Sequence, residues 1–90
     1  VIGAHPHVLQ PLKRQGSALV AYSLGNFVFG AVSPETTATG ILETDLTSEG
    51  VAAARWRQGT ISGGRPRLDR KRPKALPLDD PAAMSAGVTL

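Results

Sequence analysis

Two histidines placed two residues apart are the side chains of this sequence best suited to chemistry. His5 and His7 flank Pro6 directly after an apolar run. Neutral imidazole is a good ligand for first-row transition metals near pH 7. Pro6 favours an extended conformation at His5, and in an extended segment positions i and i+2 face the same side. We therefore interpret residues 5–7 as a candidate metal-binding loop.

The same two histidines do not complete a metal site. Even an open catalytic zinc site needs three protein ligands, and the chain has no cysteine to supply a thiolate. Taken alone, a His-x-His pattern in a loop is most often a pair of solvated polar residues. Because Val1 already lies inside an apolar run, we expect the sequence to be the carboxyl-terminal part of a longer chain. Further ligands would then lie upstream.

A second polar segment follows the apolar run at residues 18–24. Gly25 permits close backbone approach, and the Asn26 amide can both donate and accept hydrogen bonds. In covered sheets, polar residues just past the strand ends line the functional crevice. A tight turn would also explain the Gly-Asn pair. We predict that Asn26 binds substrate beside the histidines and is not a metal ligand.

Several short strands are expected around these motifs. Alternating polar and apolar residues predict an antiparallel hairpin of residues 41–46 and 51–57, closed by a turn at 48–50. A carboxylate of the first arm, Glu43 or Asp45, should pair across the strands with an arginine of the second, Arg55 or Arg57. Elsewhere we expect the end of a buried strand at 1–3, extended chain at 8–14, a strand buried on both faces at 18–24, a loop at 31–38, and order fading at 63–64.

The positive charge of the chain is concentrated in one run. Residues 65–74 carry six cationic side chains and one carboxylate, whereas the whole chain has a net charge of +3, so the other residues sum to −2. A nucleic-acid surface usually interleaves basic residues with aromatic ones, and no aromatic residue follows Trp56. The sequence therefore argues against nucleic acid as a partner. A solvated linker is favoured, and contact with a polyanion or anionic lipid stays open.

Taken together, the motifs closely resemble the carboxyl-terminal part of CapA-type capsule (poly-γ-glutamate) synthesis proteins, which are related to calcineurin-like metallophosphoesterases. The resemblance spans residues 1–68. It rests on the segments Gly3-Ala4-His5-Pro6-His7-Val8-Leu9-Gln10, Ser23-Leu24-Gly25-Asn26-Phe27, Glu35-Thr36-Thr37, Gly40-Ile41-Leu42 and the Gly50-Val51 hairpin ending at Trp56. Residues 69–90 are expected to form a basic, proline-containing tail, with a short helix near residues 80–86 begun by Asp80 and Pro81.

The resemblance implies a fold and a chemistry. The fold class would be α/β or α+β, with this mostly β fragment ending a four-layer metallophosphoesterase-like sandwich. His5 and His7 match a loop that supplies one histidine to each of two adjacent divalent metals. Such a pair clamps a phosphoryl group and activates water, and the remaining ligands would lie upstream. This fragment alone would then be inactive.

Two functions follow from the resemblance. The first is a metal-dependent phosphoesterase of capsule or poly-γ-glutamate biosynthesis, acting on an anionic polymer or phosphoester, with membrane-associated synthesis machinery as partner of the full-length protein. The second is a non-catalytic protein that binds or anchors the polymer with the same crevice. The cell envelope is the favoured location, and a cytoplasmic one stays open. A complete set of upstream ligands would favour the enzyme.

Overall fold

The chain folds as a mostly β fragment with two small helices, which confirms the predicted α+β class. The computed structural model describes residues 1–88. In chain order its elements are β1 Leu12–Gln15, β2 Ala18–Ala21, α1 Pro34–Thr37, β3 Ala38–Thr47, β4 Gly50–Ser62, β5 Arg65–Leu68, β6 Lys74–Ala75 and α2 Pro81–Val88. That these strands belong to a four-layer sandwich stays a prediction. Neither described helix is long and apolar enough to cross a bilayer.

The largest element is the antiparallel β3–β4 hairpin, which confirms the predicted pairing and extends it. Its register runs from Ala38 opposite Thr60 to Thr47 opposite Gly50. The predicted cross-strand pairing is made by Arg55, at 3.2 Å to Glu43 and 2.8 Å to Asp45, whereas Arg57 donates to the backbone carbonyls of Asp69 and Lys71. The long strands are favoured because polar and apolar residues alternate along both arms.

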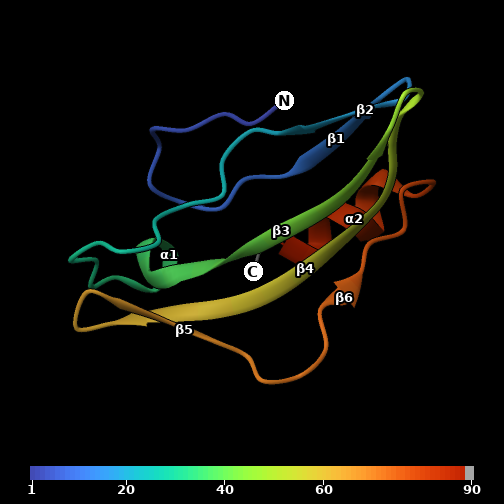
Figure 1. Cartoon of the computed structure of the whole chain (residues 1–90). Helices are drawn as coiled ribbons and strands as arrows, with labels where there is room; N and C mark the ends of the chain where they lie inside the picture. Colours follow the sequence, from blue (N-terminus) through green and yellow to red (C-terminus); the bar gives the residue numbers. More distant parts are fainter. Residues whose placement is uncertain (89–90) are drawn as a thin grey trace.

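The remaining strands extend the sheet and build a second layer. β5 and β6 pair with two successive stretches of β4, on the edge that β3 leaves free. β1 and β2 form a separate antiparallel pair, which lies beside the long hairpin (Figure 1). The predicted loss of order at 63–64 is wrong, because Gly63 and Gly64 form the turn into β5 with φ of +59° and +77°.

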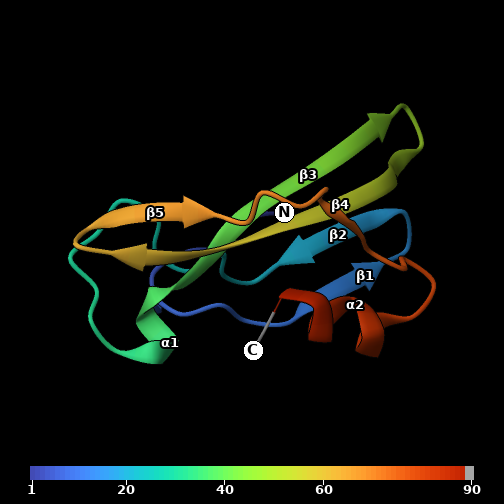
Figure 2. The ribbon, with the colours of Figure 1, turned by 90° about the horizontal axis from the view of Figure 1, so that it is seen from below.

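The core lies where β1, β2, β4 and α2 meet. It is formed by buried apolar residues from both layers and the last helix: Leu12, Leu19, Ala21, Ala54, Trp56, Leu76, Met84 and Val88. α2 begins as predicted, since the Asp80 carboxylate accepts a hydrogen bond from the Ala83 amide at 3.2 Å and Pro81 is the first helical residue. Figure 2 shows α2 beside β1. The segment after residue 68 thus contributes to the core, while a boundary there stays a prediction.

Three expectations for the first forty residues are wrong in detail. Residues 1–3 are joined to β2 by backbone hydrogen bonds, but the side chains of Val1 and Ile2 are exposed, not buried. β2 ends at Ala21, because the chain beyond it turns away and rejoins the sheet only through a bridge between Leu24 and Leu9. The expected loop at 31–38 contains the single helical turn α1.

Candidate functional site

The two histidine side chains lie side by side on the surface, in the loop between the first residues and β1. Their ring centroids are 6.1 Å apart, and both residues are exposed. The expected extended conformation is wrong, because His5 has φ of +107° and His7 has φ of +62°. Positive φ costs about 1–3 kcal/mol at a non-glycine residue, although histidine adopts it more often than most residues. A turn of the loop, not strand alternation, places the two rings side by side.

Asn26 fixes the orientation of the His7 ring. Its side-chain oxygen lies 2.7 Å from His7 Nδ1, and its side-chain nitrogen donates to the carbonyl oxygens of His7 and Thr36, both at 3.1 Å. Because the amide nitrogen is committed as the donor, the oxygen must accept, and Nδ1 must carry the proton. In neutral His7 the lone pair is then on Nε2, which is the form of imidazole that binds a metal.

Asn26 is itself held by buried contacts. The residue is only 7% exposed, and its carbonyl oxygen accepts a hydrogen bond from the Thr39 hydroxyl, which is fully buried. Thr36, whose carbonyl accepts from Asn26, belongs to α1, where its hydroxyl accepts from the Ser33 amide at 3.2 Å. These supporting contacts were not predicted from the sequence. The serine and threonine three residues apart around Pro34 are a capping pattern that could have indicated the helical turn.

The turn before Asn26 explains why glycine precedes it. Gly25 has φ of +70°, a conformation that glycine adopts without steric cost. Its amide donates to the hydroxyl of buried Ser23 at 3.1 Å, and a β-carbon at Gly25 would lie 3.1 Å from the Ala38 carbonyl oxygen. The tight turn at Gly25 therefore positions Asn26 for its contacts with His7.

An aromatic ring forms the wall beside His7. The Phe29 ring centroid lies 5.1 Å from that of His7, with the planes tilted by 33°. Phe29 is itself half exposed. We refer to His5, His7, Asn26 and Phe29 as the histidine site. Carboxylates are absent from the surrounding sequence, since the first acidic residue of the chain is Glu35.

The histidine site fits part of a metal centre. The lone pair of His7 Nε2 is left available by the bond to Asn26, and His5 supplies a second imidazole nearby. Within residues 1–88, however, no group of three or more histidine, cysteine or acidic side chains could hold a metal ion. The described residues therefore offer two ligands, and a complete site needs others.

Comparison with known proteins adds a family likeness. Residues 1–31, which include all four residues of the histidine site, match the model of the bacterial capsule synthesis protein PGA_cap. The chain is 36% identical over 50 residues to the "PGA biosynthesis protein CapA" of Bacillus subtilis (strain 168), covering 56% of this chain. It is also 36% identical over 52 residues to the "Capsule biosynthesis protein CapA" of Bacillus anthracis, covering 58% of this chain.

These matches are partial with respect to the relatives. The aligned part spans 13% of the length of each curated relative. No solved structure shows a significant match to the chain.

Proposed function

We propose that His5 and His7 are ligands of a divalent metal pair in a phosphoesterase of capsule polymer biosynthesis, because residues 1–31 match the capsule synthesis family model and the two imidazole rings lie side by side. The observation that supports the proposal is the contact between His7 Nδ1 and the Asn26 side-chain oxygen, at 2.7 Å. This contact leaves the lone pair of His7 on Nε2, as a metal ligand needs, and makes Asn26 the hydrogen-bond partner that orients the ring. The strained backbone of both histidines is consistent with a functional constraint.

Each group then has a defined task. His5 and His7 would hold the metal ions together with ligands from outside these 90 residues. Two such ions would polarise a phosphoryl group and lower the pKa of a bound water. Asn26 would keep the His7 ring oriented, and its place behind the ring leaves it beside the metal. The substrate would be a phosphoester or an anionic polymer such as poly-γ-glutamate.

Metal analysis of the intact protein tests this proposal. His5→Ala and His7→Ala should each lower the divalent metal content measured by elemental analysis, while the thermal unfolding temperature changes little, because both side chains are exposed. Gln15→Ala is the control, since Gln15 is an exposed polar residue on β1, outside the histidine site. Unchanged metal content in both histidine variants would refute the metal-ligand role.

The second candidate function is polymer binding without catalysis, and the charge distribution favours it. None of the four residues of the histidine site is acidic, so no carboxylate within the site would repel an anion. If the metal content were unchanged while the histidine variants bound poly-γ-glutamate more weakly in calorimetry, this candidate would replace the first.

A further inference from the structure

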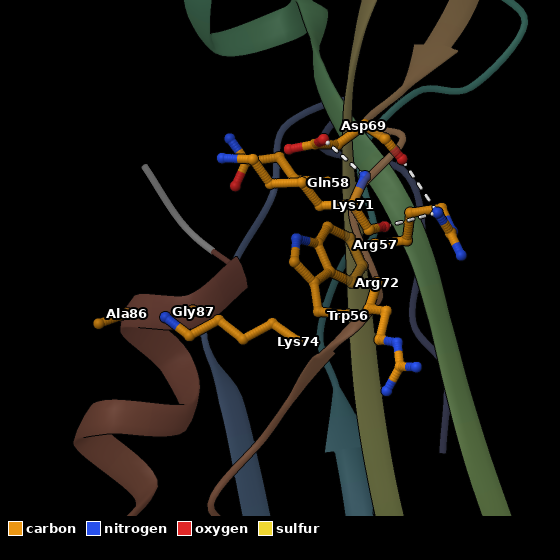
Figure 3. A pocket seen from close by; sticks show the side chains of 9 residues that line it. All are labelled: Trp56, Arg57, Gln58, Asp69, Lys71, Arg72, Lys74, Ala86 and Gly87. Atoms are coloured by element: carbon orange, nitrogen blue, oxygen red, sulfur yellow. Dashed lines mark hydrogen bonds between the residues drawn. The ribbon is translucent and has the colours of Figure 1, made fainter.

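A second polar feature lies about the middle of the long strand β4, apart from the histidine site. It is a pocket of about 280 Å³ between β4, the segment joining β5 to β6, and the end of α2 (Figure 3). We call it the Trp56 pocket. Its lining residues are Trp56, Arg57, Gln58, Asp69, Lys71, Arg72, Lys74, Ala86 and Gly87. None of them belongs to the histidine site.

The pocket contains a buried donor that has no acceptor. Trp56 is 2% exposed, and its indole nitrogen has no hydrogen-bond partner within residues 1–88. Indole nitrogen can only donate, and an unsatisfied buried donor costs about 1–3 kcal/mol. In Figure 3 the nitrogen faces the side of the pocket on which Gln58 and the end of α2 lie. A ligand oxygen at this point would complete the hydrogen bond.

The cationic wall of the pocket is fixed to the sheet. Arg57 donates to the carbonyl oxygens of Asp69 and Lys71 at 3.0 and 2.9 Å, and the Asp69 amide donates to the Gln58 carbonyl at 2.8 Å. The Asp69 carboxylate accepts from the Lys71 amide at 3.0 Å. The basic segment is therefore an ordered part of the sheet edge here, in contrast to the solvated linker that its composition favoured.

This arrangement leaves positive charge available to a ligand. Four cationic side chains and one carboxylate line the pocket. Arg57 and Asp69 are occupied in holding the wall, whereas the side chains of Lys71, Arg72 and Lys74 make no hydrogen bond or ion pair within the described part of the chain. The Lys74 side chain extends across the pocket toward Gly87 (Figure 3). A bound oxyanion would meet both these charges and the indole N–H.

We propose that the Trp56 pocket binds a carboxylate group of an acidic polymer. One carboxylate oxygen would accept from Trp56 Nε1, and the ammonium groups of Lys71 and Lys74 would neutralise the charge. A volume of about 280 Å³ suits one short acidic side group and is below the usual range of drug-sized ligand sites. A single-stranded nucleic acid is less favoured, because the pocket has no second aromatic ring for base stacking.

This inference deepens the proposed function and rests on it only for the identity of the polymer, poly-γ-glutamate. Binding of short poly-γ-glutamate oligomers to the intact protein can be measured by calorimetry and by tryptophan emission. Trp56→Phe removes the donor and keeps most of the ring, so we expect binding measured by calorimetry to weaken about fivefold. Lys74→Gln should weaken binding to a similar extent, about fivefold.

Arg67→Gln is the matched control. Arg67 is an exposed residue of the same basic run, but it lies on β5 and does not line the pocket. It should leave binding within twofold of the wild-type value. An equal loss in Arg67→Gln and Lys74→Gln would overturn the proposal, because the effect would then be diffuse charge. If Trp56→Phe fails to fold, the comparison of these two variants decides.

Two further measurements distinguish a carboxylate from other anions, and this inference from the proposed function. Inorganic phosphate at the same carboxylate-equivalent concentration should displace the oligomer poorly, and tighter binding of phosphate or of a single-stranded oligonucleotide would overturn the assignment to a carboxylate. His7→Ala should leave binding at the Trp56 pocket unchanged while lowering metal content. If His7→Ala lowers the metal content but the wild-type protein does not bind the oligomer, only the inference about the Trp56 pocket is refuted. If the oligomer binds at the Trp56 pocket but His7→Ala leaves the metal content unchanged, only the metal-ligand proposal is refuted.

Discussion

The histidine site and the β3–β4 hairpin are stabilised by different interactions. In the hairpin, a regular backbone register and buried side chains such as Trp56 maintain the structure. At the histidine site, two residues adopt strained φ values, and side-chain hydrogen bonds to Asn26 maintain a loop that has no regular strand. Strain is tolerated only where surrounding contacts determine the backbone. The hairpin is thus the regular scaffold, and the histidine loop, where we propose the metal ligands, depends on side-chain hydrogen bonds.

The largest effect on this comparison should come from Gly40→Ala in β3. A β-carbon at Gly40 would overlap the Trp56 ring and lie 2.6 Å from the Arg57 carbonyl oxygen. We expect a loss of about 3 kcal/mol in the free energy of unfolding, because the packed ring and backbone cannot both move away. Urea unfolding followed by circular dichroism measures it. Gly30→Ala is the control, since a β-carbon there meets no atom within 4 Å. Equal stabilities of the two variants would show that the hairpin is not the rigid scaffold described here.

A smaller and more local effect is expected from Asn26→Ala. The substitution removes the contact to His7 Nδ1 and the two bonds donated to the His7 and Thr36 carbonyls. We expect a loss of about 1–2 kcal/mol in unfolding free energy, because these partly buried groups can turn to water. The specific readout is the ¹⁵N chemical shift of the His7 ring, which should lose the bias toward the Nδ1-protonated tautomer. An unchanged tautomer distribution would contradict the orienting role of Asn26.

The smallest effect should be the pH-dependent contribution of Asp45 on the exposed face of the hairpin. The hydrogen bond and positive charge of Arg55 lower the pKa of the Asp45 carboxyl group below its usual value. A lowered folded-state pKa stabilises the fold at pH values above the unfolded-state pKa of about 4, and this contribution is lost as the pH falls through the folded-state pKa.

Asp45→Asn should therefore lower the unfolding temperature slightly at pH 7, and the difference from wild type should vanish at lower pH. Differential scanning calorimetry at steps of about one pH unit, from about pH 2 to about pH 7, measures this difference in unfolding temperature. Glu49→Gln is the control, because Glu49 lies in the exposed turn and forms no ion pair within residues 1–88. A difference that persisted at the acid end would show that Asp45 stabilises the hairpin by something other than its charge.

Alternation and capping patterns determined the regular elements of this protein from sequence alone. The β3–β4 hairpin, its Arg55 ion pairs and the Asp80 cap of α2 depend on residues close in sequence or directly opposite in register. Local patterns encode such contacts, since strand and helix periodicities fix which side chains share a face. The types of the two histidines and of Asn26 also marked the candidate site.

Tertiary structure alone decided how those residues are used. The positive φ of His5 opposes the extended conformation that Pro6 favours, and the Asn26 side chain that contacts His7 lies nineteen residues from it in sequence. The Trp56 pocket likewise needs β4, the segment after β5 and α2 to meet, and the basic run gave no sign that Arg57 would anchor it. These contacts join residues distant in sequence, so their energies appear only when the chain is folded, and a pattern read along the chain cannot contain them.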